Sequence, residues 1–253
     1  MDKVKLQQAK AWTEKELAVC ADFWLRNGMD KEHGGVYTCL DRYGRIYSTD
    51  KSVWMQGRCG WIFAYLCHVY GVKKEWLEAS KSCLDFMEKY CINPEADGRM
   101  YFTVTADGKP LRQRRYYYSE AFYAIANAEY YGVTGDKECL ERAKKAYNIY
   151  WDLWHGAKDP TGLGPKTIPE TRSGRAFGLP MIYLNVTSVM LRVDPENKAL
   201  YEERAQGCVD DIFKYHVHPE LHCVLENVGP NGEANLDYTD GRIVNPGHDI
   251  EGV

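Results

Sequence analysis

The sequence predicts an all-α fold, a toroid of helical hairpins with small β-hairpins in its loops. Over most of the chain, apolar residues recur at three- and four-residue steps, which is the period of an α-helix. Helices that are apolar on most faces, and are therefore expected to be buried, alternate with helices that carry one charged face. This unit follows a glycine-bounded hairpin and returns about every 63 residues. The repeat favours a ring of inner helices surrounded by outer helices.

An amphipathic helix over residues 5–26 comes first, and Asn27-Gly28 ends it because glycine permits the backbone conformation that closes a helix. Two repeats follow, and Ser119 is expected to cap the inner helix of the second. Each repeat has a hairpin, an inner helix and an outer helix, expected at 33–44, 51–70 and 74–90 in the first and at 98–108, 119–131 and 136–154 in the second.

A loop rich in glycine and proline, 155–178, leads to the third repeat. Its inner helix is expected over 179–191 and its outer helix over 197–216. Another glycine-bounded segment, 221–232, precedes the turn that opens a fourth inner helix. We therefore expect one domain, residues 1–253, that holds about four hairpins and lacks the C-terminal part of a closed ring.

Composition and charge exclude several classes of protein. The net charge of −4 gives no basis for nucleic-acid binding, and the run Arg112-Gln113-Arg114-Arg115 is interpreted as a local anion contact or a solvated loop. No run of 18 apolar residues predicts a membrane span, and the first 20 residues lack the apolar core of a signal peptide. Nine cysteines without a CxxC pair are expected to be reduced, in a cytoplasmic protein without a zinc site.

The stretch Asn245-Pro246-Gly247 predicts a rigid turn, because proline fixes one φ angle and glycine permits a positive one. His248 follows at once. If a helix begins here, Glu251 lies one turn later on the same face as His248. An imidazole and a carboxylate at the start of a helix could form a proton-transfer site. The alternative is a chance histidine beside a glutamate that the helix dipole favours.

Four polar residues near the starts of the expected inner helices recur at nearly equal intervals. They are Arg58, Glu120, Asn185 and His248, separated by 62, 65 and 63 residues. If the inner helices form a ring, their starts surround one cavity, and each repeat sends one polar side chain into it. The alternative is four unrelated residues at helix ends. The equal spacing favours convergence on a common pocket.

Several stretches, in order along essentially the whole chain, resemble the N-acylglucosamine 2-epimerase family, which includes the mammalian renin-binding protein. The resemblance implies a barrel of six α/α hairpins, of which about four are present here. The matching stretches are Glu32–Leu40 with Gly44, Lys51–Arg58, Ser119–Tyr123, Leu179–Asn185, Glu226–Val228, Gly241–Arg242 and Asn245–Glu251.

The resemblance also implies a reaction, the interconversion of N-acetylglucosamine and N-acetylmannosamine. A base removes the C2 proton of the open-chain sugar, an enediolate-like species forms, and a second group returns the proton to the opposite face. His248 matches the family's catalytic histidine, and histidine suits a base that works near neutral pH. Arg58 matches its essential arginine, and a fixed cation would stabilise the developing oxyanion.

Other site residues are expected on the same resemblance. Glu251 could hold the imidazole tautomer or assist ring opening. Glu120, Asn185 and Tyr117 are expected to contact the substrate. Trp54 could stack on the sugar, although its helical spacing favours core packing.

The resemblance places a second catalytic histidine beyond Val253, so we expect the polypeptide alone not to catalyse epimerisation. Two other reactions fit the same scaffold, aldose–ketose isomerisation and disaccharide 2-epimerisation. A non-catalytic protein-binding module of the renin-binding kind is a third alternative, of another class. The family also implies a homodimer when the chain is complete, no required cofactor or metal, and ATP as an activator that is not consumed. No Walker-type loop locates a nucleotide site in this sequence.

Overall fold

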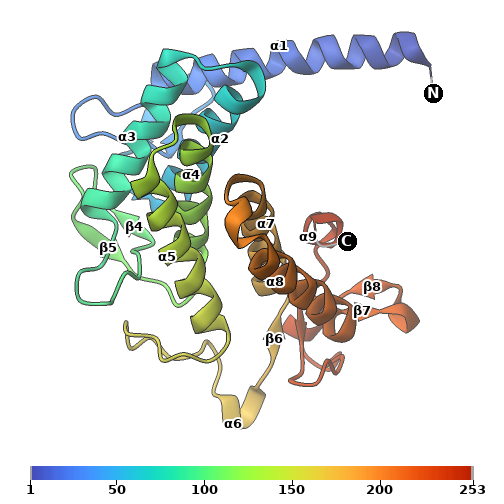
Figure 1. Ribbon diagram of the computed structural model, residues 1–253. Helices are drawn as coiled ribbons and strands as arrows, with labels where there is room; N and C mark the ends of the chain where they lie inside the picture. The colour runs from blue at the N-terminus through green and yellow to red at the C-terminus, as the bar shows by residue number, and fades with distance from the viewer. Residues whose placement is uncertain (1, 252–253) are drawn as a thin grey trace.

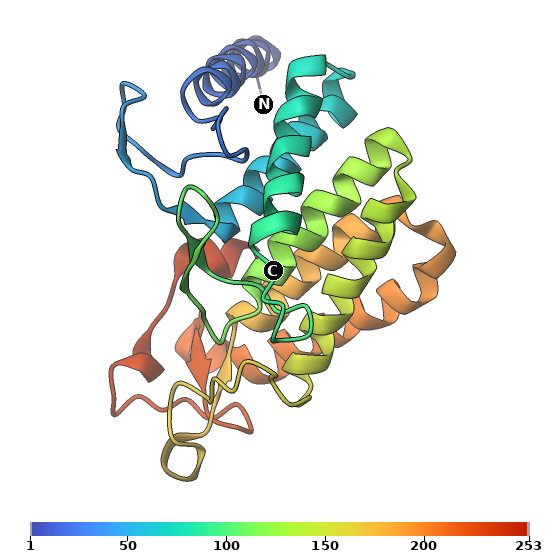
Figure 2. The same cartoon turned by 90° about the vertical axis from the view of Figure 1, so that its left-hand side faces the viewer.

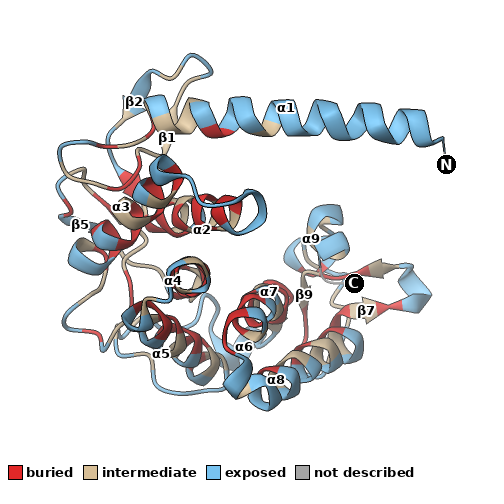
Figure 3. Cartoon of the chain, turned by 45° about the horizontal axis from the view of Figure 1, so that its top comes forward, coloured by how far each residue is buried: buried red, intermediate tan, exposed pale blue. Residues whose placement is uncertain are grey.

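The computed structural model describes residues 2–251 of the chain (Figure 1). Figure 3 shows α2, α4, α7 and α9 along the inside of an arc, with α3, α5 and α8 along its outside. The predicted alternation of inner and outer helices is therefore observed. The helices are α1 (Lys3–Asn27), α2 (Val53–Tyr70), α3 (Lys74–Tyr90), α4 (Tyr118–Thr134), α5 (Lys137–Trp154), α6 (Pro169–Arg172), α7 (Gly178–Val193), α8 (Lys198–Asp211) and α9 (Pro246–Glu251).

Short antiparallel strands lie in the loops (Figure 2), and two of the pairings join different repeats. The strand that precedes α2 pairs with the hairpin before α4, and the strand that precedes α7 pairs with one that leads toward α9. The pairs are β1 (Cys39–Leu40) with β2 (Ile46–Ser48), β3 (Lys51–Ser52) with β4 (Thr103–Val104), β4 with β5 (Pro110–Arg112), β6 (Arg175–Ala176) with β9 (Asn227–Val228), and β7 (Val217–His218) with β8 (Cys223–Val224).

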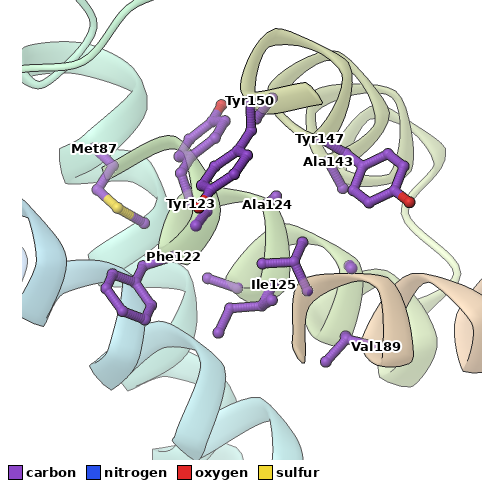
Figure 4. Close-up of a cluster of buried hydrophobic side chains, with 14 of the residues drawn as sticks. Met87, Phe122, Tyr123, Ala124, Ile125, Ala143, Tyr147, Tyr150 and Val189 are labelled. Carbon is purple, nitrogen blue, oxygen red and sulfur yellow. The ribbon is translucent and has the colours of Figure 1, made fainter. Parts of the chain in front are cut away.

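The core fills the space between the inner and outer helices, and its inner side depends on one glycine. A Cβ atom on Gly57 of α2 would lie 2.6 Å from the carbonyl carbon of Phe122 on α4, so only glycine permits this helix contact. Figure 4 shows part of the buried cluster to which Phe122 belongs, with Met87 of α3, Ile125 of α4 and Tyr147 of α5. Helix α2 is thereby fixed against α4.

A buried lysine ties the loops above α2 together. Lys51 is fully buried, and its Nζ donates to Asp30 Oδ2 at 2.7 Å, to the carbonyl of Gly34 at 2.7 Å and to that of Ala106 at 3.0 Å. Burial alone would raise the pKa of Asp30, but the hydrogen bonds from Lys51 and from backbone N–H groups lower it overall. One ammonium group therefore holds the loop before β1 and the β4–β5 hairpin in place.

Two local predictions are wrong. Ser119 is not the N-cap of α4, because the helix begins one residue earlier and Tyr117 lies at the cap position. The Ser119 hydroxyl instead donates to the carbonyl of Tyr101 at 2.9 Å. The third outer helix does not run regularly to His216, because α8 ends at Asp211 and one π-helical turn, Ile212–His216, follows it.

All nine cysteines, which lie within the described part of the chain, are free. Within residues 2–251, no helix has the length and apolar character needed to cross a bilayer. The cytoplasmic location stays a prediction.

Candidate active site

A cavity of about 690 Å³ lies between the inner helices and α1. Helices α1, α2, α4 and α7 supply most of its wall, the loop at 36–38 and α9 complete it, and its side chains are mainly apolar. The charged and amide side chains that line it are Arg58, Asn185 and Glu251.

The predicted turn at Asn245 starts α9 and presents His248. The Asn245 side-chain oxygen accepts from the N–H of Gly247 at 3.2 Å, and its carbonyl accepts from the N–H of Asp249 at 2.9 Å. His248 Nδ1 lies 2.6 Å from Glu226 Oε1. A carboxylate at this distance favours the tautomer with the proton on Nδ1, which leaves Nε2 able to accept a proton.

The backbone of Glu226 is held on both sides. Its carbonyl accepts from the N–H of Phe177 at 2.8 Å, next to the β6–β9 pair, and its N–H donates to the carbonyl of Ile243 at 3.0 Å. The Glu226 side chain is only 14% exposed, whereas that of His248 is 39% exposed. The carboxylate is therefore a fixed support for an imidazole that solvent or a ligand can reach.

Arg58 lies on the cavity wall with its guanidinium carbon 4.2 Å from the centre of the Phe122 ring. Burial lowers the pKa of the Arg58 guanidinium, and the negative charge of Glu251 acts in the opposite direction. An arginine remains protonated in either case, so the cavity contains a permanent cation.

Two carboxylates, Glu226 and Glu251, act on different side chains in the structure. Glu251 lies one turn after His248 on α9, as predicted, but the imidazole is bound to Glu226. The expectation that Glu251 holds the imidazole tautomer is therefore wrong for this structure. Glu251 lines the cavity and its charge acts on Arg58 instead.

The expectation that Glu120 contacts the substrate is also wrong for this structure. Glu120 is fully buried, and its Oε1 accepts from Arg99 Nε at 2.7 Å and from the N–H of Met100 at 2.8 Å. Burial raises the pKa of Glu120, while the charge and hydrogen bond of Arg99 lower it in part. Arg99 also binds Asp159, which lies in the long loop after α5. Glu120 therefore anchors loops and does not line the cavity.

The rotational phase of α4 explains this difference. Phe122 and Ile125 are the α4 residues that line the cavity. Two residues of an α-helix turn by about 200°, so Glu120 points away from the face that Phe122 presents. Equal spacing along the chain predicted the helix start correctly but did not fix which side chain faces inward.

Tyr117 and Trp54 also lie outside the cavity wall. The Tyr117 hydroxyl donates to the carbonyl of Leu153 at 3.3 Å, and burial raises its pKa. The Trp54 ring packs at 4.8 Å from that of Phe102 and at 5.3 Å from that of Tyr118, centre to centre. The preference for core packing at Trp54 agrees with these contacts.

Sequence reasoning gave no role to two residues that the structure makes important, Glu226 and Arg99. Glu226 belongs to a stretch that carries the family resemblance, and its contact with His248 spans 22 residues. Arg99 lies in the second glycine-bounded segment, where a cation directly before the apolar run Met100–Phe102 is the available signal.

A sequence profile described as N-acylglucosamine 2-epimerase (GlcNAc 2-epimerase) matches residues 35–253. The chain belongs to the N-acylglucosamine 2-epimerase family. It is 32% identical over 249 residues to the N-acylglucosamine 2-epimerase of Bos taurus, which covers 96% of this chain and 58% of that protein. It is 29% identical over 151 residues to the cellobiose 2-epimerase of Eubacterium cellulosolvens, which covers 59% of this chain and 35% of that protein.

Solved structures agree with the fold of this N-acylglucosamine 2-epimerase family member. The cellobiose 2-epimerase from Bacillus thermoamylovorans B4167 superposes with a TM-score of 0.74 at 19% identity, over 85% of this chain and 58% of that one. The predicted α/α-barrel fold class is therefore confirmed. The chain spans just under three fifths of the bovine relative's length.

Proposed function

We propose that this chain carries the base and the oxyanion-stabilising cation of a sugar 2-epimerase that interconverts N-acetylglucosamine and N-acetylmannosamine. The observation that carries the proposal is the 2.6 Å contact between His248 Nδ1 and Glu226 Oε1. His248 lies on α9, the helix that contributes Glu251 to a cavity wall shared with Arg58. Family membership supports the choice of a sugar substrate.

The proposed reaction begins with the open-chain sugar, whose C2–H bond lies next to the carbonyl. His248 Nε2 takes the proton, and the electron pair of the C2–H bond forms the C1–C2 double bond while negative charge moves to the carbonyl oxygen. Arg58 donates to that oxygen and stabilises its charge. Glu226 stabilises the imidazolium that forms, because it already binds the other ring nitrogen.

Inversion at C2 requires that the proton return from the opposite face. As the family resemblance implies, we expect a second acid/base group outside the described residues, and we expect the 253-residue chain alone to bind the sugar without epimerising it. Proton transfer between side chains and C2 of the sugar consumes no cofactor. ATP as an activator and assembly into a homodimer stay parts of this proposal.

Binding of an enediolate mimic tests the proposed site. The hydroxamate of a five-carbon aldonic acid places a planar, ionisable group where the enediolate would form. We expect its Kd, measured by titration calorimetry, to be about tenfold or more below that of N-acetylmannosamine, because Arg58 stabilises charge that the ground-state sugar lacks. Arg58→Gln should bring the two Kd values together.

The matched control is Arg45→Gln, since the Arg45 side chain is 78% exposed and pairs with Asp41 in a surface hairpin. This variant should keep the preference for the hydroxamate. Equal affinity of the unsubstituted protein for both ligands would contradict the proposal. Parallel titrations with mannose and cellobiose separate the amino-sugar epimerase from an aldose–ketose isomerase and a disaccharide epimerase, and we expect N-acetylmannosamine to bind most tightly.

A further inference from the structure

Three arginines lie within four residues in and just after β5. They are Arg112, Arg114 and Arg115. Among residues 2–251, no carboxylate oxygen lies within the 4.0 Å of a salt bridge from any of their guanidinium nitrogens. The proposed reaction uses none of them. A local excess of positive charge therefore remains without a partner in the described part of the chain.

Two of these cations share one aromatic ring. The guanidinium carbon of Arg114 lies 3.7 Å from the centre of the Phe102 ring, and that of Arg112 lies 5.6 Å from it. Burial lowers the pKa of Arg114, and the charge of Arg112 lowers it further. The fold therefore places two guanidinium groups near one ring, and the charge of Arg112 acts on that of Arg114.

The backbone beneath the pair is fixed, so the two side chains start from defined positions. The carbonyl of Arg112 accepts from the N–H of Phe102 at 2.7 Å. The carbonyl of Arg114 accepts from Nη2 of the fully buried Arg99 at 3.0 Å. Like-charge repulsion costs free energy, and an anionic oxygen bound between two guanidinium groups would offset that cost.

The pair also lies next to the proposed site. The Arg114 guanidinium carbon is 5.6 Å from the centre of the Trp54 ring. Trp54 and Arg58 lie four residues apart on α2, and residues at this spacing are neighbours on a helix surface. The Trp54 ring also contacts Tyr118, and the Glu226 carboxylate raises the pKa of the Tyr118 hydroxyl in addition to burial. Trp54 therefore connects the arginine pair with the helix that carries Arg58.

We propose that Arg112 and Arg114 form an anion subsite for a phosphate or carboxylate group carried by the sugar ligand at the end remote from C2. The inference rests on the proposed function, because it assumes that the reacting end of the sugar lies at Arg58. It goes further by assigning an anionic substituent to the ligand. Arg115 lies outside the subsite, since no aromatic stack holds its guanidinium group among the described residues.

Titration calorimetry with three sugars tests the subsite. The ligands are N-acetylmannosamine, its 6-phosphate, and the uronic acid in which C6 is a carboxylate. We expect at least one anionic sugar to bind about tenfold more tightly than the neutral sugar at low salt, and we expect this preference to shrink as salt screens the charges. Arg114→Gln and Arg112→Gln should each reduce the preference and leave the Kd of the neutral sugar unchanged.

Arg115→Gln is the matched control, because it removes the same charge from the next residue. This variant should keep most of the preference for the anionic sugar. An equal loss of that preference in all three variants would show that only the overall positive charge matters, which would overturn the proposal. Equal affinity for the neutral and the anionic sugars would also overturn the proposal. In that case, a preference for the hydroxamate would still support the proposed function. If none of the sugars and no hydroxamate binds, both proposals fail. Preference for the phosphate or for the carboxylate identifies the anionic group.

Discussion

His248 binds Glu226, and this contact determines which nitrogen of the imidazole can accept a proton. A hydrogen bond from Nδ1–H to Glu226 leaves the lone pair of Nε2 free, and the same carboxylate then stabilises the protonated ring. Glu251 instead lines the cavity beside Arg58, and its negative charge acts on the guanidinium group. Glu226 thus acts on the imidazole of His248, and Glu251 acts on the guanidinium group of Arg58.

Variants of the two glutamates separate these roles. In nitrogen-15 NMR spectra of the imidazole ring, we expect the unsubstituted protein to show the Nδ1–H tautomer of His248, because Glu226 accepts that proton. Glu226→Ala should give a mixture of tautomers. Glu251→Gln, the control on α9 itself, should leave the tautomer unchanged, and a shift in this variant without one in Glu226→Ala would reverse the assignment.

The sequence predicted part of this site. Of the four residues expected to converge, Arg58 and Asn185 line one cavity together with Glu251, whereas Glu120 and His248 are not among its lining residues. The expectation for Glu120 is wrong because its side chain faces away from the cavity-lining side of α4. Repeat spacing carries no information on rotation about a helix axis. Glu226 could not be assigned, since its contact with His248 depends on strand pairing between segments far apart in the chain.

At the scale of the structural elements, buried ion pairs hold loops in place, whereas apolar packing holds the helices together. Arg99 connects Glu120 at the start of α4 with Asp159 in the loop after α5. It also binds the carbonyls of Arg114 and Tyr116, which lead into α4. The helices were predicted to within a few residues from their periodicity, but periodicity carries no information on such links between loops.

Removing one member of the buried pair should destabilise the protein strongly. We expect Glu120→Ala to lower the free energy of unfolding by about 3–5 kcal/mol in urea denaturation, because Arg99 loses its fully buried counter-charge. Glu138→Ala removes a glutamate that is 81% exposed in its pair with Arg142, and should cost less than about 1 kcal/mol. Similar costs in both variants would show that the Arg99–Glu120 pair does not anchor these loops.

At the scale of the whole molecule, three buried or partly buried aspartates lower stability in acid. Burial would raise the pKa of Asp30, Asp159 and Asp194, but hydrogen bonds and nearby cations lower each one below its ordinary value of 3.8. The folded protein therefore binds fewer protons than the unfolded chain as pH falls through this window. The stability that these groups confer is present above the unfolded pKa and is lost as pH falls through the folded pKa.

Urea denaturation as a function of pH measures this effect. We expect the free energy of unfolding to fall steeply below about pH 4, and we expect Asp194→Asn to make the decline shallower, because it removes one of the three groups. The control, Asp22→Asn, alters an exposed aspartate that pairs with Arg26 on α1, and should keep the original slope. A slope that Asp194→Asn leaves intact would assign acid sensitivity to other groups.

The close approach of Gly57 to the backbone of Phe122 has a consequence for the proposed reaction. Arg58 is the next residue of α2, and its guanidinium group rests on the Phe122 ring. The cation therefore has its position set by helix packing before any sugar arrives. Little reorganisation energy remains to be spent when negative charge develops, which is the condition under which a fixed charge accelerates a reaction most. A side chain at position 57 would move the helix and shift this preset charge away from the oxygen that it stabilises in the proposed reaction.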